Sequence, residues 1–253
     1  MILDKFKLDG KVAMVTGART GLGQSIAIAL AQAGADIIGL GRSAMLETEK
    51  AVTNLGRKFL FIDADLMTIE PVGRVVEEAI QEFGQIDILV NNAGVIRRSE
   101  TIDFSEKDWD DVMNVNLKSV FFLSQAVAKE FIKREKGGKI INLASVLSFH
   151  AAARCVSYTA SKFAVVGMTK EMSNSWAKYG INCNAIAPGY HKIDMTAPLR
   201  ENPDTNSALL SKIPAGRYGD PDDLKGVAIL LASEASDYIM GETICVDGGW
   251  LAK

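Results

Sequence analysis

The sequence predicts a single α/β domain with a Rossmann-type, doubly wound parallel sheet and helices on both faces. Short apolar runs alternate with longer helical patterns along almost all of the 253 residues. The runs are nearly continuous in apolar residues, which is typical of parallel strands covered on both faces. No repeat, low-complexity tract or linker interrupts the alternation, so residues 1–253 are expected to fold as one domain.

Seven strands and six helices are expected in alternation. The strand-like runs lie at residues 11–17, 36–40, 58–66, 86–94, 138–145, 181–189 and 241–249. The helical patterns between them lie at residues 22–34, 44–56, 69–84, 104–135, 158–180 and 220–236. Gly34 and Gly56 stand where helices commonly end. Ser105 and Asp108 form an S-x-x-D capping signal, which predicts the start of one long helix over 104–135.

The least regular segment is 190–216, which holds three of the six prolines and many polar residues. It follows the carboxyl end of a predicted strand, and ligands of doubly wound folds bind at those ends. Long connections at such places often cover a substrate. We therefore expect residues 190–216 to form a substrate lid.

Composition narrows the classes of partner. The net charge of −3 gives no support for binding nucleic acid through phosphate contacts. No apolar run approaches the roughly 20 residues needed to cross a bilayer, and the mixed charge of the first residues does not resemble a signal peptide. The three cysteines lack C-x-x-C spacing and the two histidines lack metal-ligand spacing. A cytoplasmic protein with no metal and no membrane partner is expected.

The first strand runs into the glycine-rich turn "VTGARTGLG", residues 15–23. Glycines at such a turn let the backbone approach an anion at the N-terminus of the next helix. The later stretch "GLGRSA", residues 39–44, also fits a dinucleotide-binding spacing but lies one strand–helix unit further on. It marks the end of the second strand, where an acidic side chain would bond the ribose 2′-hydroxyl of NAD. Gly41 and Arg42 stand there, so Arg42, helped by Arg19, is predicted to face a 2′-phosphate.

Four motifs together resemble those of the classical short-chain dehydrogenase/reductase family along essentially the whole chain. They are T-G-x-x-x-G-x-G at Thr16, Gly17, Gly21 and Gly23, N-N-A-G at Asn91, Asn92, Ala93 and Gly94, Y-x-x-x-K at Tyr158 and Lys162, and P-G at Pro188 and Gly189. The resemblance implies hydride transfer between NAD(H) or NADP(H) and a carbonyl or secondary alcohol. It implies a homotetramer, and it places Asp65 and Leu66 beside the adenine. The expected cofactor contacts are Gly17, Arg19, Gly21, Leu22, Gly23, Arg42, Asp65, Leu66, Asn92, Ala93, Gly94, Tyr158, Lys162, Pro188 and Gly189.

The catalytic residues are expected to be Asn116, Ser145, Tyr158 and Lys162. Ketone reduction needs an acid that protonates the developing alkoxide, and oxidation needs the same group as a base. Tyrosine is poor at this near its usual pKa of about 10. Lys162 lies one helical turn after Tyr158, so its charge is expected to lower the pKa of that tyrosine. Ser145 ends the fifth strand and could hold the substrate oxygen. The family position of Asn116 bonds a backbone carbonyl and a water that serves the lysine.

Within the family, the chain is similar to members that act on six-carbon sugar acids such as deoxygluconates and gluconates. Because such a substrate carries a carboxylate, a guanidinium is expected to face it. The candidate substrate contacts are Arg97, Arg98, His150, Arg154 and Tyr190.

The chain departs from the family where a threonine that contacts the nicotinamide carboxamide would stand. Ile193 occupies that position, and Thr196 three residues later is a possible replacement. His191 and Lys192 are alternative contacts for an anionic substrate.

Three alternatives stay open. Two lie within the enzyme class, a gluconate 5-dehydrogenase and a 3-oxoacyl-carrier-protein reductase. The third is a non-catalytic nucleotide-sensing protein on the same scaffold, although such proteins commonly lose the tyrosine or the lysine, and both are present here.

Overall fold

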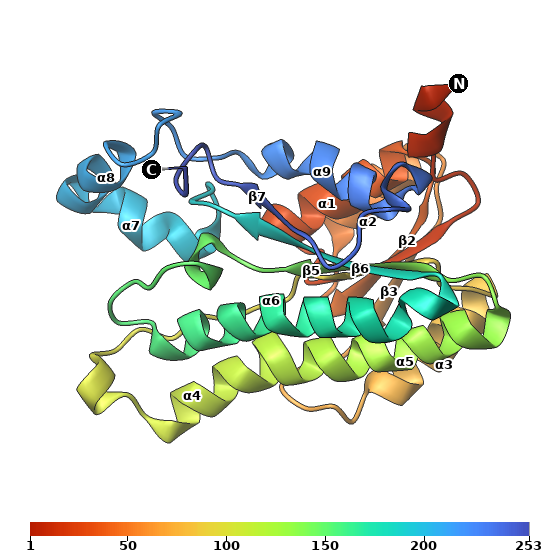
Figure 1. Cartoon of the computed structure of the whole chain (residues 1–253), viewed down its shortest axis with the longest axis horizontal. Helices are drawn as coiled ribbons and strands as arrows, with labels where there is room; N and C mark the ends of the chain where they lie inside the picture. Colours follow the sequence, from red (N-terminus) through yellow and green to blue (C-terminus); the bar gives the residue numbers. More distant parts are fainter. Residues whose placement is uncertain (253) are drawn as a thin grey trace.

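A seven-stranded parallel sheet forms the centre of the computed structural model, which describes residues 1–252 (Figure 1). Its strands are β1 (Val12–Thr16), β2 (Asp36–Gly41), β3 (Phe59–Asp63), β4 (Ile88–Asn91), β5 (Gly138–Leu143), β6 (Ile181–Pro188) and β7 (Thr243–Val246). The strand order is β3-β2-β1-β4-β5-β6-β7. This order confirms the predicted doubly wound fold class, and it reverses between β1 and β4, where such folds bind ligands.

Helices cover both faces of the sheet (Figure 1). They are α1 (Gly21–Gln32), α2 (Leu46–Asn54), α3 (Val72–Phe83), α4 (Glu106–Met113), α5 (Ser119–Arg134), α6 (Val156–Trp176), α7 (Ala197–Glu201), α8 (Pro203–Leu210) and α9 (Lys225–Ala232). Figure 1 shows α1 and α9 on one face, and α4, α5 and α6 on the other. None of these helices, within the residues described, is both long and apolar enough to cross a membrane.

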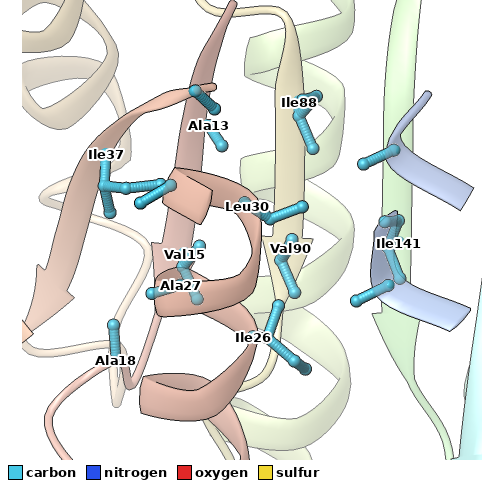
Figure 2. Packing of buried hydrophobic residues seen from close by; sticks show 14 of the residues in the cluster. Ala13, Val15, Ala18, Ile26, Ala27, Leu30, Ile37, Ile88, Val90 and Ile141 are labelled. Carbon is cyan, nitrogen blue, oxygen red and sulfur yellow. The ribbon is translucent and has the colours of Figure 1, made fainter. Parts of the chain in front are cut away.

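Two hydrophobic cores lie on opposite sides of the sheet. On one side, Ile26, Ala27 and Leu30 of α1 pack over β1, β2 and β4 (Figure 2). On the other side, Val75 of α3 and Val127 of α5 pack in a second buried cluster. Every residue of β1 is buried, as expected for a central parallel strand with two covered faces. The near-continuous apolar runs of the sequence therefore reflect burial from both sides.

The prediction of one uninterrupted helix over 104–135 was wrong in its middle. Ser105 caps the helix as expected, since its side chain accepts a hydrogen bond from the amide of Asp108 at 3.1 Å. The α-helix then gives way to a π-helical turn, Asn114–Lys118, before α5 begins. Single π-helical turns inside α-helices are frequent at functional sites. Here the turn carries Asn116, one of the predicted catalytic residues.

The segment 190–216 is more regular than its sequence suggests. It contains a 3₁₀ turn and the two short helices α7 and α8. Pro198 and Pro203 stand in the first turns of these helices, where a missing amide hydrogen costs nothing. Figure 1 shows α7 and α8 beyond the end of the sheet, near the C-terminus. Whether they act as a lid stays a prediction.

Candidate active site

A cleft of about 550 Å³ lies at the carboxyl ends of the strands. Every residue predicted to contact the cofactor lines it, including the glycine turn after β1 and the Pro188–Gly189 pair at the end of β6. Ser145, Tyr158 and Lys162 line it as well, and so do Arg97, Arg98 and Tyr190. The predicted site residues that are not part of its lining are Asn116, His150, Arg154, His191 and Lys192.

The glycine turn has a backbone that other residues would not fit. Gly17 and Gly21 have φ angles of +67° and +59°, in the left-handed region that favours glycine. A Cβ at Gly23 would lie 2.3 Å from the side-chain nitrogen of Asn92 and 2.4 Å from the carbonyl oxygen of Gly17. Glycine at these positions therefore lets the turn and the N-terminus of α1 pack tightly against the end of β4.

The N-terminus of α1 opens into this cleft with its amides free to bind a ligand. Its N-cap residue, Thr20, makes no side-chain hydrogen bond to the first turn. Uncapped amides and the positive end of the helix dipole together form an anion site. Thr20, Gly21, Leu22 and Gly23 all line the cleft, so this end of it fits the pyrophosphate of a dinucleotide.

Two exposed arginines lie on the turns that follow β1 and β2, Arg19 after β1 and Arg42 after β2. Arg19 and Arg42 line the cleft, and neither takes part in an ion pair among the residues described. Asp65 also lines it and accepts a hydrogen bond from the amide of Met67 at 3.0 Å. Gly41, at the position of the ribose-binding carboxylate in NAD-specific folds, carries no side chain. Positive charge therefore dominates where a 2′-phosphate would lie.

The N-N-A-G segment lies at the end of β4, beside the point where the strand order reverses between β1 and β4. The hydroxyl oxygen of Thr16 accepts hydrogen bonds from the amides of Asn92 and Ala93, at 2.9 and 2.8 Å. Asn91 donates to Ser124 on α5 and to Asn142 on β5, both at 2.9 Å. These bonds tie the ends of β1, β4 and β5 together. The part played by Asn142 was missed from the sequence, although an asparagine inside the apolar run "KIINL" is an available signal.

Asn116 supports the site from behind the cleft wall. Its side-chain oxygen accepts from the amide of Val95 at 2.8 Å, and its nitrogen donates to the carbonyl of Val95 at 2.9 Å. The same nitrogen lies 3.3 Å from the hydroxyl oxygen of Ser161 on α6. The π-helical turn thus connects the loop after β4 to the helix that carries Tyr158 and Lys162.

Lys162 is buried, and its ammonium group donates to the carbonyl oxygen of Leu143 at the end of β5. It lies 5.6 Å from the centre of the Tyr158 ring. Burial lowers the pKa of Lys162 to about 8.

The pKa of Tyr158 is not lowered in this geometry, contrary to the expectation from the sequence. Burial raises the pKa of Tyr158 to about 12, and it outweighs the hydrogen bond with Ser145 and the positive charge of Arg98, which both lower it. Lys162 lies over the ring and is bonded to a carbonyl, so it contributes little at the hydroxyl. The sequence spacing places the two side chains together but does not fix which part of the tyrosine the ammonium group faces.

The arginines predicted to meet a substrate have different surroundings. Arg97 is held in ion pairs, 2.9 Å from Asp111 and 3.4 Å from Asp108. Arg98 donates to the carbonyl of Met195 at 3.3 Å. Burial raises the pKa of Tyr190, and the charge of Arg98 opposes that rise only in part. Arg98 lines the cleft together with Tyr158 and Tyr190, and its guanidinium group forms no ion pair among the residues described.

Two of the substrate candidates lie outside the cleft lining. Arg154 has a φ angle of +67° and forms an ion pair with Glu100 at 3.0 Å. The imidazole of His150 accepts a hydrogen bond from the indole of Trp250 at 2.8 Å. Their side chains are used in contacts on the loops, so the structure does not support direct substrate contact by either one.

Ile193 lines the cleft where the family threonine would stand, and a Cβ at Gly21 would lie 3.2 Å from its side chain. Thr196 also lines the cleft, but its hydroxyl donates to the carbonyl of His191. His191 is buried, its ring lies against Gly219, and it is not part of the cleft lining; nor is Lys192. The structure therefore leaves Ile193 in contact with the turn and places His191 and Lys192 outside the cleft lining, so their contact with an anionic substrate stays a prediction.

Comparison with known proteins agrees with this geometry. A family model described as enoyl-(acyl carrier protein) reductase matches residues 17–251. The 2-dehydro-3-deoxy-D-gluconate 5-dehydrogenase of Dickeya dadantii is 57% identical over 253 residues, which is 100% of both chains.

Two solved structures are similar over nearly the whole length. A putative 2-deoxy-D-gluconate 3-dehydrogenase from Agrobacterium tumefaciens with bound NADP is 47% identical, with a TM-score of 0.93 over 98% of this chain and 99% of that one. A gluconate 5-dehydrogenase from Burkholderia cenocepacia, in complex with NADP and tartrate, is 40% identical, with a TM-score of 0.95 over 100% of both chains.

Proposed function

The chain belongs to the short-chain dehydrogenase/reductase family and is an NAD(P)-dependent oxidoreductase acting on a CH–OH group, and from this premise we propose its substrate. We propose that it interconverts a ketone and a secondary alcohol on a six-carbon sugar acid of the 2-dehydro-3-deoxy-D-gluconate or 2-deoxy-D-gluconate type. The observation that carries this proposal is the guanidinium group of Arg98, which lines the cleft with Tyr158 and Tyr190 and forms no ion pair with a carboxylate among the residues described. A sugar-acid carboxylate would complete that arrangement.

In the proposed chemistry, Tyr158 is the general acid and base. The nicotinamide cofactor supplies or accepts the hydride when it is bound. Tyr158 gives its hydroxyl proton to the alkoxide oxygen in reduction and takes it back in oxidation. Ser145 shares a hydrogen bond with Tyr158 and holds the same substrate oxygen. A tyrosine with a pKa near 12 holds its proton firmly, and the positive charge of Arg98, which lowers that pKa, would favour its release.

Asn116 is proposed to position this group rather than to touch the substrate. It fixes the loop at Val95 and approaches Ser161 on α6, one residue before Lys162. The glycine turn and the amides of α1 would hold the pyrophosphate, and Asp65 and Leu66 would lie beside the adenine.

We propose that NADP(H) is at least tolerated. Arg42 after β2 and Arg19 in the turn after β1 both line the cleft and form no ion pair among the residues described, and Gly41 at the end of β2 offers no carboxylate to bond a 2′-hydroxyl. Arg42 is proposed to make the main contact with the 2′-phosphate, because it directly follows Gly41.

The decisive experiment is a steady-state panel of sugar acids and sugar ketoacids, assayed with NAD(H) and NADP(H) side by side. The panel includes gluconate and an acetoacetyl thioester, which are the substrates of the two alternatives within the enzyme class. Preference for a deoxygluconate ketoacid supports the proposal. A preference for gluconate would indicate a gluconate 5-dehydrogenase. A preference for the thioester would indicate a 3-oxoacyl-carrier-protein reductase. Cofactor binding without turnover of any compound would favour a nucleotide sensor.

We also propose a homotetramer in the cytoplasm and a lid formed by residues 190–216 of a single domain. Trp109 on α4 and Phe163 on α6 are 38% and 47% exposed, which suits a contact between copies of the chain. Sedimentation analysis tests the oligomeric state. Protection of bonds within 190–216 from a protease on addition of cofactor and substrate tests the lid.

A further inference from the structure

The C-terminal segment, residues 247–252, returns to the substrate end of the molecule after β7. The carboxylate of Asp247 accepts hydrogen bonds from the amides of Gly249 and Leu251, both at 2.9 Å. The carbonyl of Gly248 accepts from the amide of Ala215, at the end of the 190–216 segment, at 3.0 Å. These bonds hold the segment in a tight turn and place Trp250 at a fixed position.

Trp250 connects two loops that are far apart in the sequence. Its indole N–H donates to Nε2 of His150, on the loop after β5, at 2.8 Å. Its ring packs edge to face on Tyr190, which follows β6, with 4.8 Å between the ring centres and 61° between the ring planes. Such aromatic pairs are favourable beyond the apolar area that they bury.

The hydrogen bond to Trp250 defines the state of His150. An indole nitrogen is only a donor, so Nε2 of His150 must accept. The ring N–H is then on Nδ1, which lies 3.1 Å from the carbonyl oxygen of Ala151. Both ring nitrogens are used, which leaves this imidazole no free group for a substrate.

Tyr190 is the member of this group that reaches the cleft. It lines the cleft together with Tyr158 and Arg98, whereas His150 and Trp250 do not. Its ring therefore stands between the cleft and the Trp250–His150 pair. A substitution of His150 or Trp250 would therefore affect the bound substrate by displacing Tyr190.

We propose that Trp250 and His150 are positioning residues that hold Tyr190 as a wall of the substrate end of the cleft. This inference rests on the proposed function, since it assigns that end to the sugar acid. The cofactor end lies at the glycine turn and does not depend on the pair. Loss of the pair is expected to weaken binding of the sugar acid while leaving the affinity for the cofactor and the chemical step unchanged.

The test compares four variants of the full-length protein by steady-state kinetics. Trp250→Phe keeps a ring on Tyr190 but removes the indole donor, so KM for the sugar acid should rise about fourfold. Trp250→Ala removes the ring as well, and KM should rise about tenfold or more. His150→Leu should resemble Trp250→Phe. His150→Gln offers an amide oxygen as acceptor and should restore KM toward its native value. The kcat and the KM for NADP(H) should stay within about twofold.

Trp109→Phe is the matched control, because it removes an exposed indole on α4 outside the cleft. The double variant His150→Leu/Trp250→Phe should be no worse than the poorer single variant, since both remove one hydrogen bond. The proposal is overturned if KM for the sugar acid is unchanged. It is equally overturned if kcat and both KM values change together with a loss of thermal stability, or if His150→Gln is as impaired as His150→Leu.

The experiment distinguishes a wrong role for Trp250 and His150 from a wrong assignment of the substrate. If the native protein turns over a different ketone from the panel, the same variants are assayed with that ketone. The split between KM for the ketone and KM for the cofactor then decides the role of Trp250 and His150 independently of the name of the substrate.

Discussion

The two ends of the cleft are built in different ways. The cofactor end consists of backbone at the ends of β1 and β4, with closely packed glycines and the first turn of α1, which no side chain caps. The substrate end consists of side chains on longer segments, among them Arg98, Tyr190 and the residues behind it. A backbone site accepts one class of ligand on many scaffolds, whereas side chains on loops select among substrates. We therefore expect the ends of the strands to determine the reaction type and the connecting loops to determine the substrate.

The largest effect is expected from a change at Tyr158, which lies between the cofactor end and the substrate end of the cleft. Tyr158→Phe removes the proton that both directions of the reaction need, and it leaves the glycine turn intact. Turnover should fall by about a thousandfold or more. Binding of NADP(H), followed by fluorescence titration, should stay within about twofold. Retained turnover would show that the tyrosine is not the acid and base.

The backbone end is tested by Gly23→Ala. The added Cβ would lie 2.4 Å from the carbonyl oxygen of Gly17, so the turn must shift. We expect the free energy of unfolding to drop by about 1–3 kcal/mol and the affinity for both cofactors to fall together. Gly226→Ala on α9 is the matched control, because its Cβ would meet nothing within 4 Å. Denaturant titration and cofactor titration of the two variants give the comparison, and equal behaviour would contradict a built backbone site.

The side-chain end is tested by Arg98→Ala. Because a charged hydrogen bond to the carboxylate is lost, KM for the sugar acid should rise about tenfold or more while KM for the cofactor is unchanged. Arg154→Ala is the control, since its guanidinium is paired with Glu100 away from the cleft. An unchanged KM in Arg98→Ala would shift the carboxylate site to Arg97.

The smallest effect is expected from Arg42→Ala, because this arginine is exposed. Affinity for NADP(H) should fall about fivefold, and affinity for NAD(H) should not fall. Arg57→Ala serves as control, since its guanidinium donates to the carbonyl of Gly34 and does not line the cleft. Equal losses for both cofactors would mean that Arg42 does not contact the 2′-phosphate.

The residues predicted to contact the cofactor all line one cleft, and the sequence could bring them together because its signals there are local. Apolar runs indicate the strands. The glycines within residues 17–23 indicate a turn, because glycine readily adopts positive φ angles. The same reasoning missed the π-helical turn at Asn114–Lys118, since no composition signal separates it from the α-helices around it. The turn is stabilised by bonds from Asn116 to Val95, which lies 21 residues away.

The substrate end was predicted less well because it depends on how the loops fold in three dimensions. Arg154 and His150 lie between Ser145 and Tyr158 in the sequence, yet their side chains pair with Glu100 and Trp250. The second of these partners is 100 residues away. The direction of the Tyr158 pKa shift was missed for a related reason, since it depends on burial and on which part of the ring Lys162 faces.

The hydroxyl of Thr16 has a consequence for the energetics of binding. It accepts two amides of the N-N-A-G segment, and its side chain is β-branched and therefore rotationally stiff. The floor of the cleft is thus already ordered before any ligand arrives. A dinucleotide entering there loses little free energy to ordering of the protein. The expected order of events is that the cofactor binds first, to the rigid floor, and the substrate second.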